Sequence, residues 1–239
     1  MRLDRFLSHL PHAGRQQARR WLAAGQVRVD GVLIHDPHRD VTAFSRIELG
    51  GQLLQSRQPR YFMLHKPRGY LSATTDLQHP TALDLLDEPD REQLHIGGRL
   101  DRNSTGLLLI TDDGRWSRHL THPDKQWAKV YRVETEDPIH PDTASRFAAG
   151  IYFDFEAITT RPVRLEQLGS HQVRLWLYEG RYHQIKRMFG RFRNKVLALH
   201  REQMGEIVLD PALAPGEYRA LTQAEIDSVV AEPAAGLTP

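Results

Sequence analysis

Apolar side chains in the first 25 residues recur at the spacing of two short helices. The first stripe has the spacing i, i+3, i+4 and i+7 and predicts a helix over residues 2–10 that stops at Pro11. Its members are Leu3, Phe6, Leu7 and Leu10. The second stripe contains Ala18, Trp21 and Leu22, and it predicts a helix that Gly14 caps and Gly25 ends. The chain is therefore expected to open with two amphipathic helices.

The pattern changes to period two after the second helix. Residues 26–34 alternate apolar and polar about the pair Asp30-Gly31, which favours a tight hairpin turn. Residues 55–60, with the sequence QSRQPR, are polar and contain a proline, as linkers often do. We therefore predict a small domain over residues 1–57 and a larger one over residues 61–233, with a frayed tail at 231–239.

The larger part mixes strand and helix patterns. Strand-like runs occur at 61–72, 107–110, 129–135 and 172–178, and the second of these is expected to end in a turn at Asp112-Asp113-Gly114. Helical spacing returns at Ile185, Met188 and Phe189. Because no βαβ unit repeats, the predicted class is α+β, with a mixed, largely antiparallel sheet and flanking helices.

Composition and charge narrow the functional classes. The 239 residues include 40% apolar residues and no cysteine, so disulfides, zinc-thiolate sites and iron–sulfur clusters are excluded. We find no secretory signal and no apolar run of membrane-spanning length, and we expect a cytoplasmic protein that does not bind membranes. Residues 1–60 carry ten arginines against five acids. Such a basic segment is suited to nucleic acid, because phosphate charge dominates that affinity.

Common cofactor motifs are missing. The sequence contains no GxxxxGK[ST] loop, GxGxxG fingerprint or HExxH pair, so nucleoside triphosphate, dinucleotide and zinc-protease chemistry have no support. His119 and His122 lie three residues apart, but the sequence supplies no matching third ligand. No metal site is predicted.

An aspartate in an unusual setting is the main candidate for chemistry. The run GRLDRNSTGLLLITDDG at 98–114 places Asp101 between Arg99 and Arg102, at the start of an apolar strand. Neighbouring positive charge would keep the carboxylate ionised, either as a structural counter-ion or as a nucleophile. A different possibility is a hydrolase or nuclease in which Asp101, Asp112 and Asp113 hold a divalent ion.

Four separated motifs resemble the pseudouridine synthases that modify ribosomal RNA. They are KPRG at 66–69, the run at 98–114, KVYRV at 129–133 and EGRYHQIKRMF at 179–189. In the small domain, RQQARRWLAAGQVRVDG at 15–31 resembles the S4 RNA-binding domain. The resemblance implies an S4-like domain followed by a pseudouridine synthase catalytic domain. It also implies covalent catalysis by an aspartate, on a uridine that is flipped out of the RNA, without a coenzyme.

The resemblance assigns roles residue by residue. Asp101 matches the family nucleophile, and Tyr131 matches the tyrosine that stacks on the target base and assists the final proton removal. Lys186 matches the basic partner of the aspartate, with Arg181 as the alternative for that pairing. The remaining matches and candidate contacts concern substrate binding: Arg99 for the flipped nucleotide, Leu199 for the base pocket, and Lys66, Arg68, Arg15 and Arg19 for phosphates.

The narrower substrate assignment depends on a few residues. Tyr182-His183 and the segment 197–226 resemble the branch that converts one uridine of 16S rRNA. Relatives that act on large-subunit RNA tend to have Asn-Arg in place of Tyr182-His183. We expect a monomer that isomerises a uridine to pseudouridine in 16S rRNA or in a small-subunit assembly intermediate. The alternatives are an enzyme acting on 23S rRNA and a non-catalytic S4-type RNA-binding or ribosome-assembly protein.

Overall fold

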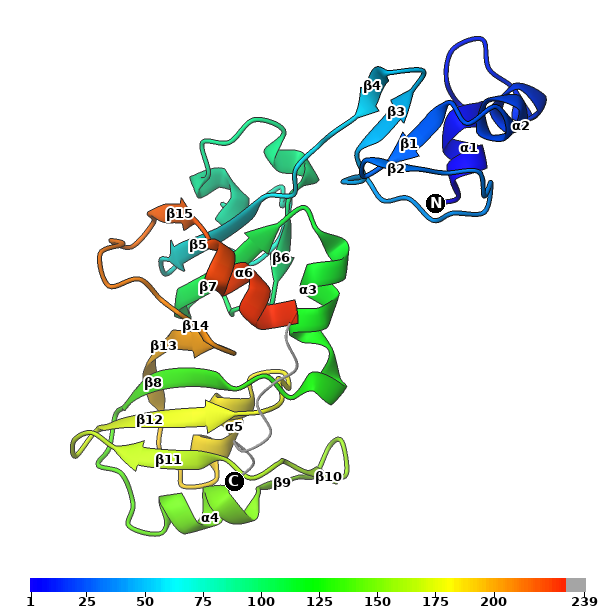
Figure 1. The fold of residues 1–239 in the computed structure, drawn as a ribbon. Coiled ribbons are helices and arrows are strands. Elements are labelled where there is room, and N and C mark those ends of the chain that lie inside the picture. Colours follow the sequence, from blue (N-terminus) through cyan, green and yellow to red (C-terminus); the bar gives the residue numbers. More distant parts are fainter. Residues whose placement is uncertain (231–239) are drawn as a thin grey trace. The chain divides into compact units, whose positions relative to one another are not determined.

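The computed structural model describes residues 1–230, and the predicted frayed tail at 231–239 lies outside the described residues. The chain divides into two compact units, with the division between Pro59 and Arg60 (Figure 1). Within residues 1–230, no helix is both long enough and apolar enough to cross a membrane.

The small unit places two helices against an antiparallel sheet. Leu3 and Leu7 of α1 and Ala18 and Leu22 of α2 are buried, as their spacing predicts. Asp30 and Gly31 have positive φ angles of 52° and 81°, so the predicted hairpin turn is confirmed. The sheet order is β2-β1-β3-β4. The elements are α1 (Leu3–Ser8), α2 (Arg15–Ala23), β1 (Val27–Val29), β2 (Val32–Leu33), β3 (Ile47–Leu49) and β4 (Gln52–Gln55).

The large unit is built on one extended sheet with the order β11-β12-β8-β13-β7-β5-β15, to which β14 and β6 add at the side. The pairing of β13 with β7 is parallel, and the other strand pairings of this sheet are antiparallel. The predicted mixed, largely antiparallel sheet is therefore confirmed. Its strands are β5 (Tyr61–Lys66), β6 (His95–Gly97), β7 (Thr105–Thr111), β8 (Lys129–Thr135), β11 (Arg164–Gln167), β12 (Gln172–Leu177), β13 (Val196–Met204), β14 (Ile207–Val208) and β15 (Tyr218–Ala220).

Two apolar cores cover opposite faces of this sheet. Leu107 and Leu109 of β7 belong to one core, whereas Leu108 and Ile110 belong to the other. Because β7 is buried on both faces, its sequence is continuously apolar rather than alternating. The first core includes α3 and α6, and the second includes α4 and α5 (Figure 1). The remaining elements are α3 (Gly114–Thr121), α4 (Thr143–Ala149), α5 (Gln184–Gly190), α6 (Gln223–Val230), η1 (Ala82–Leu85), η2 (Arg91–Gln93), η3 (Pro123–Lys125), β9 (Tyr152–Phe153) and β10 (Ile158–Thr159).

The segment Asp112-Asp113-Gly114 does more than end a strand. The Asp113 carboxylate accepts hydrogen bonds from the backbone amides of Arg115 and Trp116, and so it caps a helix, α3, that the sequence pattern did not predict. Asp113 also accepts a hydrogen bond of 2.8 Å from the hydroxyl of Tyr61. The predicted turn is thus the start of a helix.

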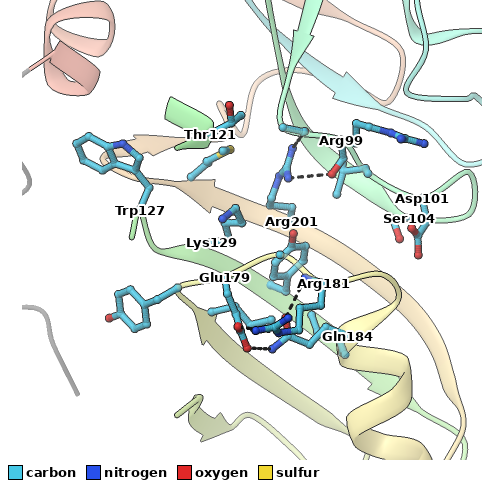
Figure 2. Close-up of a pocket in the computed structure, with 18 of the residues that line it drawn as sticks. Arg99, Asp101, Ser104, Thr121, Trp127, Lys129, Glu179, Arg181, Gln184 and Arg201 are labelled. Atoms are coloured by element: carbon cyan, nitrogen blue, oxygen red, sulfur yellow. Dashed lines mark hydrogen bonds and ion pairs between the residues drawn. The ribbon is translucent and has the colours of Figure 1, made fainter. Parts of the chain in front are cut away.

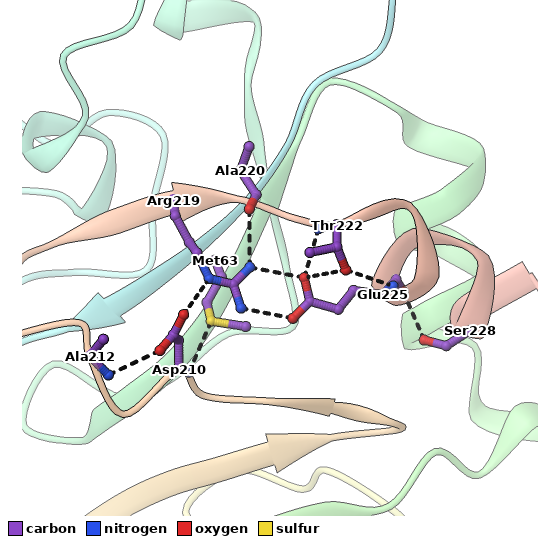
Figure 3. Close-up of polar contacts among 8 residues, drawn as sticks. All are labelled: Met63, Asp210, Ala212, Arg219, Ala220, Thr222, Glu225 and Ser228. Atoms are coloured by element: carbon purple, nitrogen blue, oxygen red, sulfur yellow. Dashed lines mark hydrogen bonds and ion pairs between the residues drawn. The ribbon is translucent and has the colours of Figure 1, made fainter.

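One arginine joins the last strand to the last helix. Figure 3 shows the Arg219 guanidinium between Asp210 and Glu225, to which it donates at 2.7 Å and 2.9 Å. Glu225 also accepts hydrogen bonds from the amide and the hydroxyl of Thr222. These bonds fix the start of α6 next to β15.

Candidate active site

The Asp101 loop, residues 98–104, connects β6 to β7 and is held from one side by a buried arginine. Arg201 of β13 is 1% exposed, and its Nε donates to the Leu107 carbonyl at 2.8 Å. Its two terminal nitrogens donate to the carbonyls of Gly98, at 2.8 Å, and Arg99, at 3.4 Å. A charged group donating to several carbonyls is a strong constraint on backbone position. Arg201 therefore fixes the first turn of the loop (Figure 2).

A buried lysine holds the other end of the Asp101 loop. Lys66 is 0% exposed, and its ammonium donates to four backbone carbonyls at 2.9 to 3.3 Å. These carbonyls belong to Pro67, Asp101, Arg102 and Ser104. Burial lowers the pKa of Lys66 to about 8, although the negative charge of Asp101 opposes this shift. The prediction that Lys66 contacts phosphate is thus corrected, because its ammonium is enclosed and fully used in supporting the loop.

Two glycines let the backbone come this close. Gly106 has a φ angle of +103°, and a Cβ atom there would overlap the backbone of Arg201 on the neighbouring parallel strand. Gly98 has a φ angle of +90°, and its Cβ would lie 2.8 Å from Cε of Met204. Glycine at position 106 is therefore a steric requirement of the pairing between β7 and β13, and glycine at position 98 is favoured by its positive φ angle.

The partners of Asp101 come from α5 rather than from the adjacent sequence. Oδ2 of Asp101 lies 2.9 Å from Nζ of Lys186 and 3.4 Å from Nε2 of His183, and the Asp101 side chain is 31% exposed. Arg102 instead donates to the Gly69 carbonyl at 3.1 Å. The expectation that Arg99 and Arg102 hold the charge of Asp101 is therefore corrected. Tertiary packing brings Lys186 to this carboxylate, whereas the neighbouring arginines point elsewhere.

A carboxylate organises the segment that leads into α5. Glu179 accepts hydrogen bonds from Arg181 Nε, at 3.0 Å, and from Gln184 Nε2, at 2.7 Å (Figure 2). The backbone amide of Arg161 donates to the same carboxylate at 2.9 Å. Arg181, the alternative partner for Asp101, is thus paired with Glu179. Its ion pair shapes the segment that carries His183 and Lys186.

These groups surround a pocket of about 660 Å³. Six of the predicted site residues line this one cavity: Arg99, Asp101, Tyr131, Arg181, Lys186 and Leu199. Tyr131 is largely buried and Leu199 is half-buried. The volume falls within the range of about 300 to 1,000 Å³ that is usual for small-molecule sites.

Lys129 is a second lysine of the pocket wall, two residues before Tyr131 on β8. Figure 2 shows it between Trp127 and Arg201. Burial and the nearby charge of Arg201 lower the pKa of Lys129 to about 8, and Glu179 opposes the shift. Within residues 1–230 its ammonium has no hydrogen bond or ion pair. Lys129 is half-buried, and a partly desolvated cation without a partner is unfavourable for folding, which points to a role with a ligand.

The other predicted contacts are exposed. Arg99 lines the pocket, and its side chain has no hydrogen bond or ion pair within the described part of the chain. Arg68 is exposed and donates to the Leu197 carbonyl at 3.2 Å. Arg15 and Arg19 lie exposed on α2 of the small unit. All four could reach a polyanion without unfolding the structure around them.

The divalent-ion alternative is not supported by the arrangement of carboxylates. The Asp112 carboxylate accepts hydrogen bonds from the amide and the side chain of Arg60, and Asp113 caps α3. Neither residue lines the pocket with Asp101. The described residues also contain no cluster of three or more potential metal ligands.

Sequence reasoning did not place His183, Lys129 or Glu179 at the site. Two of them carried usable signals. His183 precedes Lys186 by three residues, a spacing that puts both on one side of a helix start. Lys129 shares a strand face with Tyr131 because side chains alternate along a strand. Glu179 gave no such signal, because its partners come from the turn geometry around it.

Comparison with known proteins identifies the family of this site. Residues 60–190 match the model of the RNA pseudouridylate synthase family, and residues 1–47 match the S4 domain. The chain belongs to the RNA pseudouridylate synthase family. The predicted family, the two-part fold class and the assignment as an enzyme are confirmed.

Individual relatives extend over nearly the whole chain. The ribosomal small subunit pseudouridine synthase A of Pseudomonas aeruginosa is 56% identical over 230 residues, which cover 96% of this chain and 100% of the relative. The protein of the same name from Escherichia coli K12 is 47% identical over 236 residues, with the same coverage. A solved structure described as a pseudouridylate synthase superimposes with a TM-score of 0.71 at 38% identity and covers 96% of this chain and 99% of its own.

Proposed function

We propose that this protein converts a uridine of 16S rRNA to pseudouridine, with Asp101 as the nucleophile. The observation that carries the proposal is the contact of 2.9 Å between Asp101 and Lys186 at the wall of a pocket that Tyr131 also lines. The names of the relatives at 56% and 47% identity refer to the small ribosomal subunit and support this choice of substrate. RNA of that subunit is the 16S species.

The reaction is an isomerisation in which atoms balance without a coenzyme. The bond between ribose C1′ and uracil N1 breaks, and a bond between C1′ and C5 forms. The proton on C5 leaves, and N1 gains one. The Asp101 carboxylate acts as nucleophile, either on the ribose or on the uracil ring, and carries one fragment while the base turns. The ammonium of Lys186 donates to that carboxylate and orients it for the attack.

Tyr131 receives the target base. A uridine that is stacked or paired hides the atoms to be attacked, so it must leave the helix and enter a pocket. We assign the ring of Tyr131 to stacking against the uracil and its hydroxyl to assisting removal of the C5 proton. Leu199 provides apolar contact on the pocket wall, and Arg99 at the rim positions the flipped nucleotide.

The remaining basic residues contribute position rather than chemistry. Arg68 of the large unit and Arg15 and Arg19 of the small unit contact phosphates, which carry no sequence information but fix the register of the RNA. The substrate is 16S rRNA or a small-subunit assembly intermediate. We further propose that the enzyme works in the cytoplasm as a monomer.

The decisive experiment maps pseudouridines in both ribosomal RNAs from cells with and without the gene. One site in 16S rRNA is expected to be lost on deletion and regained with the wild-type gene. The Asp101→Asn variant should fold and bind RNA but fail to restore the modification. A lost site in 23S rRNA would reassign the substrate, and full modification by Asp101→Asn would overturn the mechanism.

A further inference from the structure

Two aromatic rings are stacked at the edge of the pocket, next to the proposed nucleophile. The rings of Tyr182 and His183 lie 3.9 Å apart between centroids, with 21° between their planes. His183 lines the pocket, whereas Tyr182 does not and is 77% exposed. The stack therefore runs outward from the pocket wall into solvent.

The backbone at this point is arranged to make the stack. Successive side chains of an extended chain point to opposite sides. His183 instead adopts the left-handed conformation, with φ 49° and ψ 32°, at the start of α5. Residues other than glycine seldom adopt this backbone conformation unless the surrounding structure enforces it. Here Arg187 donates to the Tyr182 carbonyl at 3.4 Å, and the Arg187 amide donates to the His183 carbonyl at 3.0 Å.

The inner ring contacts the carboxylate that performs the proposed attack. Nε2 of His183 lies 3.4 Å from Oδ2 of Asp101, the oxygen that also faces Lys186. Two groups thus converge on one oxygen of the Asp101 carboxylate. The His183 ring therefore has the Tyr182 ring on one face and the Asp101 carboxylate at its Nε2 edge.

We propose that Tyr182 stacks on a nucleobase next to the target uridine, and that His183 positions Asp101 through this stack. An exposed aromatic ring at the edge of a pocket that takes RNA offers a flat surface to any base, and the second ring beneath it keeps that surface rigid. Binding of the neighbouring base then holds His183 against the nucleophile. The inference rests on the proposed function, and it adds to that function a rim contact for the RNA and a positioning residue.

The test separates binding from chemistry. Single-turnover pseudouridine formation on a protein-free 16S rRNA transcript, with enzyme concentration varied, gives an apparent dissociation constant and a rate constant for each variant. Tyr182→Ala should raise the dissociation constant by about 10- to 100-fold, the usual effect of losing one stacked base, and Tyr182→Phe should restore tight binding. Tyr152→Ala is the matched control, since Tyr152 is 52% exposed on β9 and does not line the pocket.

His183 should affect the rate constant instead. His183→Leu removes the polar edge and should lower the rate constant by at least about 10-fold with little change in the dissociation constant. His183→Gln keeps an N–H group near the position of Nε2 and should recover most of the rate. A variant whose rate merely reflected a damaged fold would not be rescued in this way, and thermal unfolding of each variant checks the fold directly.

The outcomes distinguish this inference from the proposed function. If the wild-type enzyme modifies neither ribosomal RNA, whether as a protein-free transcript or in subunit particles, the proposed function fails. If the wild type is active and Tyr182→Ala binds the transcript equally well, the stacking role is overturned. A defect of Tyr182→Ala that appears only with protein-containing subunit particles would also overturn it, because the ring would then contact a protein. An unchanged rate in His183→Leu would overturn the positioning role.

Discussion

Nζ of Lys186 lies 2.9 Å from Oδ2 of Asp101, although 85 residues separate them in the chain. Arg99 and Arg102, which flank the aspartate in sequence, make no comparable contact, and Arg102 donates to the Gly69 carbonyl. The charge that faces the proposed nucleophile is thus delivered by the start of α5. Activity should follow this spatial pairing and not the sequence neighbourhood.

Lys186→Met is therefore expected to lower the rate of pseudouridine formation by roughly 100-fold, the size typical for losing one preorganised charge contact. Arg102→Met is the matched control, since it removes a neighbouring positive charge that does not touch the carboxylate, and it should change the rate less than about threefold. Single-turnover kinetics on 16S rRNA measure both. Equal losses in the two variants would show that general positive potential, not the pairing, supports Asp101.

Lys66 and Arg68 lie two residues apart, but substitution of Lys66 should lower stability, whereas substitution of Arg68 should weaken RNA binding. Lys66→Met leaves four backbone carbonyls of the Asp101 loop and its surroundings without their donor, so the free energy of unfolding should fall by roughly 2 to 4 kcal/mol. Arg68→Met should change it by less than about 0.5 kcal/mol but weaken RNA binding and its salt dependence. Urea unfolding and RNA titrations at two salt concentrations check the pair. A stable Lys66→Met protein with weak RNA binding would restore the phosphate role for Lys66.

Gly106 and Gly114 provide a second matched pair. At Gly106 the φ angle of +103° and the backbone of Arg201 leave no room for Cβ, and Gly106→Ala should lower the free energy of unfolding by more than about 2 kcal/mol. At Gly114, the first residue of α3, no atom lies within 4 Å of the position that a Cβ would occupy, and Gly114→Ala should be neutral or slightly stabilising. Thermal unfolding of both variants tests this. A neutral Gly106→Ala would mean that β7 and β13 can separate without loss.

Much of the architecture was predictable because it depends on local patterns. The helical stripe at Leu3 and Leu7, the Asp30-Gly31 turn and the alternation in β8 each reflect one period or one turn type. α3 was missed because its start doubles as a strand end, where Asp113 serves both elements. The parallel pairing of β13 with β7 joins strands about 90 residues apart, and no local pattern records it.

The candidate site likewise contains residues that the sequence indicated and contacts that only the fold creates. Residue types and motifs indicated Asp101, Tyr131 and Lys186, and the structure gathers all three around one pocket. The phosphate contact predicted for Lys66 was wrong because a lysine next to a turn is normally expected to be exposed. Here the Asp101 loop folds over its ammonium and buries it. The pairing of Arg181 with Glu179 was not predictable either, because two side chains that are two residues apart in a turn have no fixed relative orientation.

Chelation of divalent ions should leave the chemical step intact. The reaction proposed for Asp101 needs a carboxylate and a proton acceptor, and Asp112 and Asp113 are engaged in structural contacts. Once the RNA has been folded, excess EDTA is expected to change the single-turnover rate by less than about twofold. The control repeats the assay with the RNA folded in EDTA from the start, which separates an effect on the RNA from one on the enzyme. A strict requirement for metal after folding would favour the hydrolase or nuclease alternative.

Lys129 should reduce stability at neutral pH in exchange for a charge that faces the pocket. Its pKa is about 8 in the folded protein against 10.5 for the ordinary side chain, so below pH 8 the ammonium is protonated in both states and its burial opposes folding. Lys129→Met is therefore expected to raise the free energy of unfolding at pH 7 by on the order of 2 to 3 kcal/mol, while it lowers RNA modification.

The stabilisation by Lys129→Met should shrink with pH. Between pH 8 and 10.5 the folded wild type releases the proton that the unfolded chain still holds, so wild-type stability gains on the variant across this window. Urea unfolding of both proteins at pH 7 and pH 10 measures the difference, and the shift at Lys66 cancels because both proteins contain that group. A variant less stable than the wild type at pH 7 would show that the ammonium of Lys129 is satisfied in the folded state, and that its charge is structural.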